Sequence, residues 1–568
     1  MLSLAPISST AISSLEDSAT GALSATGEIA GEFDIESFDA FADFMASRSE
    51  KVVAAEITVK EIGALESEAY EVYHATHAFI TGSSATPADT PFSNRLRNGV
   101  KVTKTLSIGT HGFGQVSISW GTLEYNNADH ELDTLVEDNV IDGRDVLLMI
   151  GETIGGGDVA PYTEFYPAFM GTSVKWHNAG DTITHDVRDY AKRLEVPSQP
   201  NVYSGTGGMN GGPELANKRI PRTFGYCKNV RPDNVIPAES IMKWNDGPSQ
   251  AVLRCESRGY PLDFYADYSS VDLLRTSAPV AGQYATCLAE SCIKIGGFFT
   301  EIRLDVQGDK TGGTYRTTVA DILKQIITTA TDMTTANIDD TAYAALNASQ
   351  PAVVGYHLPS DSNETVAQTA SKLLAGVGAF GYFVLDQHVV RRFEAPSSIA
   401  PVEYLTEATT IDVKLDRLPD SISPPPRRQR AIYGRNWHPL TDIVGFVSET
   451  DPNRAAYLSS PHQVATTAAA LEAAVLIDHP EAPDPEPIES HFDTLADAAE
   501  EAERVHALYS GNLRLYEITV FNRTLVYELG QALHVTHSKH GLTAGKLLTI
   551  TEIAEDFESK VTTVKAFG

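Results

Sequence analysis

The sequence predicts a mainly β protein of several domains that also contains one small α+β module. Three observations support this fold class. The chain has 568 residues, more than one ordinary domain holds. Short segments with apolar residues at every second position recur along most of it, as in half-buried strands. Helical periodicity is clearest at residues 318–330, 364–376 and 494–509.

Residues 1–50 are expected to form an N-terminal extension that is either flexible or folded onto a partner. The segment is rich in Ala, Ser, Gly, Asp and Glu, and it lacks the basic start and apolar centre of a signal peptide. Phe38, Phe41 and Phe44 are spaced three apart, which favours an amphipathic docking helix over residues 35–45. A loose tail is the alternative.

Residues 51–310 are expected to fold as two β-rich domains. Residues 115–123 (QVSISWGTL) alternate cleanly, and residues 144–150 (RDVLLMI) read as a buried strand. Short strands separated by turn signals predict a barrel or sandwich over residues 51–155. The second domain, residues 156–310, contains a glycine-rich loop and all four cysteines.

The clearest helical stripe opens the α+β module, which we place at residues 311–400. Its first helix covers residues 318–330, and its second follows at 364–376 with Asn363 as the expected N-cap. Two strands are expected at 380–385 and 388–394. Five apolar residues form the stripe of the first helix: Val319, Ile322, Leu323, Ile326 and Ile327.

Residues 401–568 are expected to form a C-terminal β-barrel region that also contains helices and a Pro-rich loop. The helices are predicted at 464–475 and 494–509, and the loop is the polar stretch HPEAPDPEPIES, residues 479–490. The buried stripe of the second helix is predicted to consist of Leu495, Ala498, Ala502, Val505 and Leu508.

The formal net charge of −32 argues against a surface that grips nucleic acid, because phosphate binding needs clustered Lys and Arg. The acidity indicates either plain solubility or a channel wall that DNA passes without adhering. No apolar run reaches the roughly 20 residues needed to span a bilayer. We therefore expect no stable membrane insertion, and DNA only in transit.

Four cysteines lie close together in the sequence, at Cys227, Cys255, Cys287 and Cys292. No CxxC pair occurs, so the usual zinc and thioredoxin spacings are absent. Buried free thiols are the plain interpretation, and no cofactor is then expected. An iron–sulfur cluster held by the four thiolates is the alternative.

Other motifs that suggest chemistry are incomplete. The glycine run at 205–212 (GTGGMNGG) lacks the Lys-Ser/Thr of a phosphate loop and indicates a surface or interface loop. His534 and His537 would point to opposite faces of a strand, which argues against joint metal binding. No hydrolase motif is present, so we predict no catalytic residue and no enzymatic activity.

A basic cluster interrupts the acidic chain at Arg427, Arg428 and Arg430, within PPPRRQR. It indicates either a solvated loop or a contact with an acidic neighbouring subunit, where the planar guanidinium groups would act as donors.

Four stretches resemble tail proteins of long-tailed, non-contractile bacteriophages and related phage-like particles: residues 77–151, 199–232, 245–262 and 278–297. The C-terminal half resembles the same family more loosely. Residues 311–400 are similar to the inserted domain of its hub proteins, and residues 525–553 are similar to their closing barrel. The residues that mark the first stretch are Leu123, Asn126, Asp129, Leu132, Asp133, Asp142, Gly143, Arg144 and Val146.

The resemblance implies a homotrimeric structural virion protein with tail-tube-like β-barrels, made in the host cytoplasm and placed in the tail as the central baseplate or tail-tip hub. Such a hub joins the tail tube and distal tail ring to the host-recognition apparatus and forms part of the DNA exit channel. The implied partners are the distal tail, tail tube, tape measure and tail fibre or receptor-binding proteins. The alternatives are a peripheral receptor-binding or fibre-anchoring subunit and a tail-associated cell-wall hydrolase.

Overall fold

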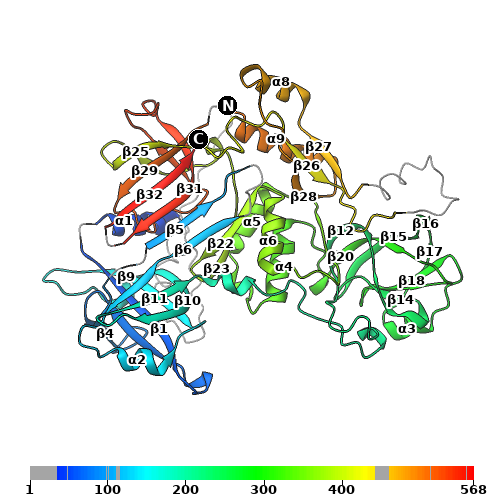
Figure 1. Cartoon of the computed structure of the whole chain (residues 1–568), viewed down its shortest axis with the longest axis horizontal. Coiled ribbons are helices and arrows are strands. Elements are labelled where there is room, and N and C mark those ends of the chain that lie inside the picture. The colour runs from blue at the N-terminus through cyan, green and yellow to red at the C-terminus, as the bar shows by residue number, and fades with distance from the viewer. Residues whose placement is uncertain are drawn as a thin grey trace, which may run out of the picture. The chain divides into compact units, whose positions relative to one another are not determined.

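A computed structural model describes residues 35–568 apart from residues 48, 98, 100, 110–114, 442–459, 512 and 558, together with the side chains from residue 40 onward. The chain forms two compact units (Figure 1). Unit 1 takes the residues up to 100 and residues 121–187, and unit 2 takes residues 101–120 and 188–568. Expectations for residues 1–34 and for Phe38 lie outside what the structure describes.

Unit 1 is built on one large sheet with the strand order β3-β4-β2-β1-β9-β10-β11-β7, and β8 also pairs with β1. The sheet closes because residues 95–97, which follow β4, pair with β7: Arg97 N donates to Glu124 O at 2.8 Å and Asn126 N to Arg95 O at 2.7 Å. The sheet therefore curves round on itself as a barrel, and it includes β10 and β11, which lie beyond the boundary expected at residue 155. Its strands are β1 Lys51–Glu61, β2 Tyr70–Ala75, β3 Phe79–Ile80, β4 Pro91–Asn94, β7 Thr122–Asn126, β8 Asn139–Val140, β9 Asp145–Glu152, β10 Tyr166–Asn178 and β11 Thr182–Arg188.

Two helices accompany this barrel, α1 (Ile35–Ala46) and α2 (Asp133–Asp138). The Phe41 and Phe44 rings of α1 pack on Tyr166 of β10, with centroid distances of 5.2 and 4.8 Å. The helix expected at 35–45 therefore packs on its own unit and buries the Phe41 ring against the barrel wall.

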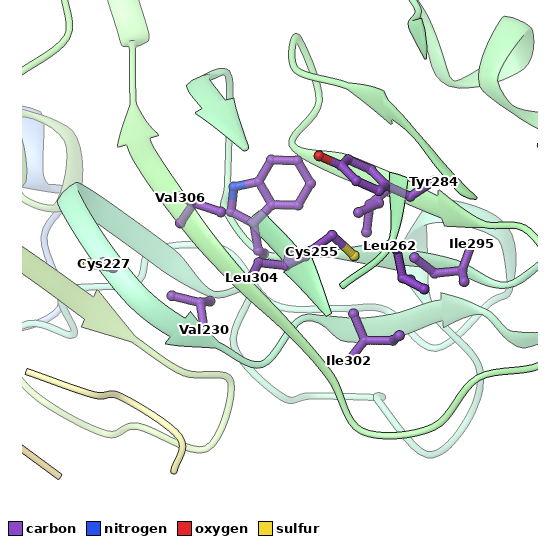
Figure 2. Close-up of a cluster of buried hydrophobic side chains, with 11 residues drawn as sticks. Cys227, Val230, Cys255, Leu262, Tyr284, Ile295, Ile302, Leu304 and Val306 are labelled. Carbon is purple, nitrogen blue, oxygen red and sulfur yellow. The ribbon is translucent and has the colours of Figure 1, made fainter. Parts of the chain in front are cut away.

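The first part of unit 2 contains two five-stranded sheets with the orders β16-β15-β20-β12-β21 and β13-β14-β19-β18-β17. Side chains from both sheets form one buried cluster around Trp244, Cys255 and Tyr284 (Figure 2). The strands are β12 Arg222–Val230, β13 Asp233–Ile236, β14 Ile241–Lys243, β15 Ser249–Ser257, β16 Tyr260–Pro261, β17 Asp263–Asp267, β18 Gln283–Cys287, β19 Cys292–Ile295, β20 Ile302–Asp309 and β21 Gly355–Leu358, and helix α3 is Val271–Thr276.

The α+β module contains helices α4 (Val319–Ala330), α5 (Asp340–Ser349) and α6 (Val366–Ala375) and the hairpin β22 (Ala379–Val384) and β23 (Gln387–Arg392). All five residues of the predicted α4 stripe are buried. The predicted N-cap Asn363 is wrong: Thr365 caps α6, because its Oγ1 accepts from Gln368 N at 3.3 Å and Gln368 Oε1 accepts from Thr365 N at 3.1 Å.

The last part of unit 2 contains an eight-stranded sheet and a three-stranded sheet. The larger follows the order β24-β30-β31-β32-β29-β25, and the hairpin β5–β6 attaches to β31. Helix α9 (Leu495–Tyr509) packs on the smaller sheet, and α8 is Ala469–Asp478. The strands are β5 Lys101–Leu106, β6 Val116–Trp120, β24 Pro401–Leu405, β25 Thr410–Asp416, β26 Arg430–Tyr433, β27 Gln463–Thr466, β28 Ile488–Phe492, β29 Leu515–Phe521, β30 Ala532–Val535, β31 Lys546–Asp556 and β32 Val561–Phe567.

Three local expectations are corrected in this last part. Leu495 is 54% exposed and lies outside the buried stripe of α9, because it is the first residue of the helix. Residues 463–466 form β27, so the predicted helix begins only at Ala469. Residues 525–527 read as a short strand in the sequence, but residues 524–526 form a turn in which Leu525 has a φ of 59°.

The fold class is confirmed: the chain is mainly β, with several sheets and one small α+β module. No helix among the described residues is long and apolar enough to cross a membrane.

Candidate assembly surfaces

The residues that carry the family resemblance in unit 1 hold its loops in place. Asp133 Oδ1 accepts hydrogen bonds from Asn127 Nδ2 and Asn178 Nδ2, both at 2.7 Å, and thereby ties the loop after β7 to the end of β10. Asp129 pairs with Arg95 at 2.6 Å. These are structural roles, since each polar side chain satisfies a neighbour within the same unit.

The Asp142-Gly143-Arg144 turn is fixed in the same manner. Gly143 has a φ of 73°, a conformation that glycine adopts without strain. Its N–H donates to Ser173 O at 3.0 Å, and Ser173 N donates to Arg144 O at 2.8 Å. The Arg144 guanidinium then bonds Glu66 at 2.8 Å.

The four cysteines are divided between two cores. Cys227 and Cys255 lie in the cluster around Trp244 (Figure 2), whereas Cys287 and Cys292 face one another on β18 and β19 in the cluster around Tyr203. Burial raises the pKa of all four thiols, that of Cys292 to about 12. The fold thus divides the thiols between two cores, and their raised pKa values favour the protonated form.

The other motifs singled out in the sequence have structural surroundings. The glycine-rich loop folds on itself, with Gly205 N donating to Asn210 O at 3.0 Å and Gly207 N to Gly211 O at 2.7 Å. His534 packs its ring on Tyr404, and His537 lies beside Glu407. Over the described part of the chain, no three His, Cys, Asp or Glu side chains are grouped so as to hold a metal ion.

The arginine cluster finds its acidic partner within the chain. Asp484, in the Pro-rich loop, accepts from Arg427 at 2.6 Å and from Arg428 at 3.0 and 2.6 Å, and it lies 3.5 Å from Arg430. Hydrogen bonds from Arg428 and Arg427 lower the pKa of the Asp484 carboxyl to about 2. Within this chain the arginine cluster therefore fastens the Pro-rich loop through Asp484.

A buried charged group joins the hairpin β5–β6 to the C-terminal sheet. Lys104 Nζ of β5 lies 2.7 Å from Glu528 Oε1, and Glu555 of β31 lies beside them and accepts from Leu525 N at 2.6 Å. Burial raises the pKa of Glu555 to about 7, and the nearby Lys104 partly opposes this shift. These contacts are internal to unit 2 and serve its architecture.

The outer face of the C-terminal sheet carries charges of both signs. Lys414 lies 3.4 Å from Asp412 and 3.5 Å from Glu517, and Lys565 lies 3.1 Å from Asp416 and 3.3 Å from Glu552. Each of these two lysines thus lies between two carboxylates of the same sheet.

A strongly exposed apolar surface lies at one end of the first part of unit 2. Phe264 is 57% exposed, Val280 64% and Phe298 92%. Their backbones meet, because Asp263 N donates to Gly282 O at 2.9 Å and Gly282 N to Gly296 O at 3.3 Å. Tyr265 and Leu273, in the same part of unit 2, are exposed as well. We refer to Phe264, Val280 and Phe298 as the 264–298 surface.

Close packing of two loops builds this surface. A Cβ at Gly296 would lie 2.1 Å from Val280 O and 2.5 Å from Pro279 O, so only glycine permits the loops to meet. Strand β17, which carries Phe264 and Tyr265, ends the path of its sheet, and its aromatics stand at an edge. The sequence does not by itself predict this surface; the signals it carries are the FY pair within DFYAD and the FF pair at 298–299.

Neither a protein-family model nor a curated protein matches the sequence. Among solved structures, the chain is similar to a tail protein from Neisseria meningitidis MC58, with 11% identity, a TM-score of 0.35, and coverage of 91% of this chain and 96% of that one. It is also similar to the 43 kDa tail protein of prophage MuSo2 from Shewanella oneidensis, with 10% identity, a TM-score of 0.34, and coverage of 90% and 98%.

A third similar structure is a chain of the virion of a native gene transfer agent particle, with 11% identity, a TM-score of 0.35, and coverage of 62% of this chain and 84% of that one. All three are described as tail or virion proteins.

Proposed function

We propose that this chain is a structural virion protein, the central hub of a phage-like tail tip. In this role it joins the tail tube and distal tail ring to the host-recognition apparatus and forms part of the DNA exit channel as a homotrimer. Two compact β-rich units, tied internally by buried charges and close-packed loops, suit a permanent building block. We assign it no catalytic residue and no cofactor.

The observation that carries the proposal is the 264–298 surface. Soluble monomers rarely keep several large apolar side chains together in water, and aromatics at the end of a sheet mark contacts between proteins. Charged residues of both signs flank it, among them Asp263, Asp267 and Arg275. Such a mixed surface can meet a second copy of itself in a cyclic assembly without strong repulsion.

Exposed aromatics also fit a peripheral receptor-binding subunit, which is the second candidate. The two functions differ in stoichiometry and in neighbours. A hub assembles with further copies and with the tail-tube and distal-tail proteins, whereas a peripheral subunit binds cells as a monomer or on a fibre.

The test is light scattering of the full chain, alone and with its tail-tube and distal-tail neighbours. A trimer, or a monomer that trimerises with those neighbours, is expected. Phe264→Ser/Phe298→Ser should weaken the self-association by at least ten-fold, because burying each phenyl ring contributes about 1.5–3 kcal/mol. The matched control is Phe521→Ser, at a 50% exposed position on β29.

A persistent monomer that ignores the tube proteins but binds host cells overturns the hub and supports the peripheral role. Cleavage of peptidoglycan by the purified chain would instead support a tail-associated hydrolase.

A further inference from the structure

The connection between β1 and β2 forms an exposed apolar tip on unit 1. Ile62 is 62% exposed, Leu65 69%, Tyr70 44% and Val140, on the adjacent β8, 38%. The last paired residues before the connection are Val59 and Tyr70, and Lys60 pairs with Val140. The four residues therefore lie at the end of the barrel where β1 finishes. We refer to them as the 62–70 tip.

Hydrogen bonds hold this tip in a defined conformation. Ile62 N donates to Asp138 O at 2.8 Å, and Lys60 Nζ donates to Ala64 O at 2.9 Å. Leu65 N donates to Glu68 Oε2 at 2.7 Å. Because the backbone of the tip is already ordered, the tip would lose little conformational entropy when a partner covers Ile62 and Leu65.

The tip is anchored from the neighbouring strand as well. Tyr70 Oη donates to Asn139 Oδ1 at 3.0 Å, which keeps the aromatic ring beside β8 while its face remains accessible. A rigid, exposed aliphatic and aromatic group of this kind resembles the anchor side chains that dominate the binding energy of protein interfaces.

A rim of negative charge surrounds the apolar centre. Six exposed carboxylates belong to the connection and to the adjoining end of α2: Glu61, Glu66, Glu68, Glu71, Glu137 and Asp138. The two basic residues nearby are Lys60 and Arg144, and both lie on Glu66, at 3.9 and 2.8 Å. The rim therefore stays strongly acidic after internal pairing is taken into account.

This charge pattern selects among occupants. A second copy would bring the same acidic rim against its own, which costs free energy through like-charge repulsion. Anionic lipid and nucleic acid are repelled for the same reason. A protein surface with an apolar socket and a rim of Lys and Arg would bury the apolar centre of the tip and pair with its acidic rim.

We propose that the 62–70 tip docks into a partner protein whose surface has an apolar socket surrounded by basic residues. We refer to the tip in this role as the knob. The assignment rests on the proposed hub role, which supplies the tail-tube and distal-tail proteins as the partners to be tested. It differs in kind from the 264–298 surface, whose mixed charge suits contacts between copies.

The experiment measures binding of the full chain to purified tail-tube protein and to purified distal-tail protein at several salt concentrations. Ile62→Ser/Leu65→Ser should weaken binding to one of them at least ten-fold. The matched control is Ile154→Ser, in the same unit and 48% exposed. Ile154 lies at the opposite end of the β1–β9 pair, because Glu152 pairs with Lys51 at the start of β1.

Charge is tested separately. Wild-type affinity should fall as salt rises, since the attraction is between a negative rim and a positive one. Glu61→Lys/Glu137→Lys should weaken binding and flatten the salt dependence. The control is Asp158→Lys/Glu164→Lys, which changes the net charge by the same amount at exposed positions elsewhere in unit 1. It should leave the affinity and its salt dependence unchanged.

The two proposals fail in different ways. If the wild-type protein binds one neighbour and all tip variants bind it equally well, the docking role of the tip is overturned and the hub role stands. If the tip variants only lower the oligomer mass, the tip contacts a second copy of the chain, and the proposed partner is overturned as well. Wild-type protein that binds neither neighbour overturns the hub role and this assignment with it.

Discussion

Lys104 and Glu528 are 424 positions apart in the sequence, yet Lys104 Nζ lies 2.7 Å from Glu528 Oε1 in the interior of unit 2. The lysine belongs to β5, which pairs with β31 from Glu552↔Thr105 to Asp556↔Lys101. The β5–β6 hairpin lies in the sequence between the two segments of unit 1. The ion pair therefore helps to attach this hairpin to the C-terminal part of unit 2.

Lys104→Met should destabilise unit 2 by about 3 kcal/mol, because it leaves the half-buried Glu528 and the buried Glu555 without their nearby cation. Urea denaturation of the full chain, followed through unit 2, measures the loss. Lys101→Met is the matched control: this lysine is 60% exposed and pairs with Asp556 at 3.2 Å. The double variant Lys104→Met/Glu528→Leu should recover part of the loss, and equal effects for Lys104→Met and Lys101→Met would contradict the prediction.

Glu555→Gln should change the pH dependence of stability in a defined direction. Burial raises the folded-state pKa of Glu555 from 4.5 to about 7. The protonated side chain therefore contributes fully to the free energy of unfolding below pH 4.5, and this contribution is lost as the pH rises toward 7. Relative to the variant, the wild type should therefore lose stability between these values, by up to about 1.4 kcal/mol for each unit of raised pKa.

Denaturation midpoints of both proteins across this pH range provide the measurement. Glu552→Gln, on the same strand and paired with Lys565 at 3.3 Å, serves as the control. A constant difference between wild type and Glu555→Gln at all pH values would show that Glu555 does not titrate there.

The sequence predicted helices well wherever a buried stripe repeats over three turns. The five stripe residues of α4 and four of those predicted for α9, Ala498 to Leu508, are buried as expected. Helix α5 was missed because it buries only Tyr343 and Leu346, too few for a recognisable stripe. The cap of α6 was placed two residues early, since Asn363 and Thr365 are both competent caps and only Thr365 is followed three residues later by a glutamine.

Long-range pairing could not be predicted in the same way. Alternating residues in 116–120 indicate a strand, but nothing local says that the β5–β6 hairpin joins β31 or that β21 joins β12. The exposed 264–298 surface and the 62–70 tip were missed for a related reason. A short apolar run looks the same in sequence whether its side chains are buried or exposed.

Asp484→Asn should loosen the Pro-rich loop. The carboxylate accepts from Arg427 and Arg428, and its folded-state pKa of about 2 lies below the ordinary 3.8. Its contribution is therefore present above pH 3.8 and is lost as pH falls toward 2. Because this side chain is 27% exposed, we expect a local loss of about 1 kcal/mol at neutral pH.

Hydrogen exchange of residues 479–490 would record this loosening as faster exchange. Glu486→Gln, an exposed acid in the same loop, is the control and should leave the exchange unchanged. Equal protection in Asp484→Asn and wild type would show that the arginine cluster does not fasten the loop.

Native protein should be almost inert to thiol reagents and should expose all four thiols only on unfolding. Cys227 and Cys255 are buried in one core and Cys287 and Cys292 in another, and burial raises the pKa of each thiol, so little reactive thiolate is present. A thiol titration with and without denaturant measures this.

An iron–sulfur cluster would need these four side chains to converge as thiolates on one centre. Protein purified without oxygen should therefore be colourless and free of bound iron and sulfide. A visible absorption band that disappears when iron is removed, together with thiols that become reactive in the folded protein, would contradict the division of the cysteines between two cores.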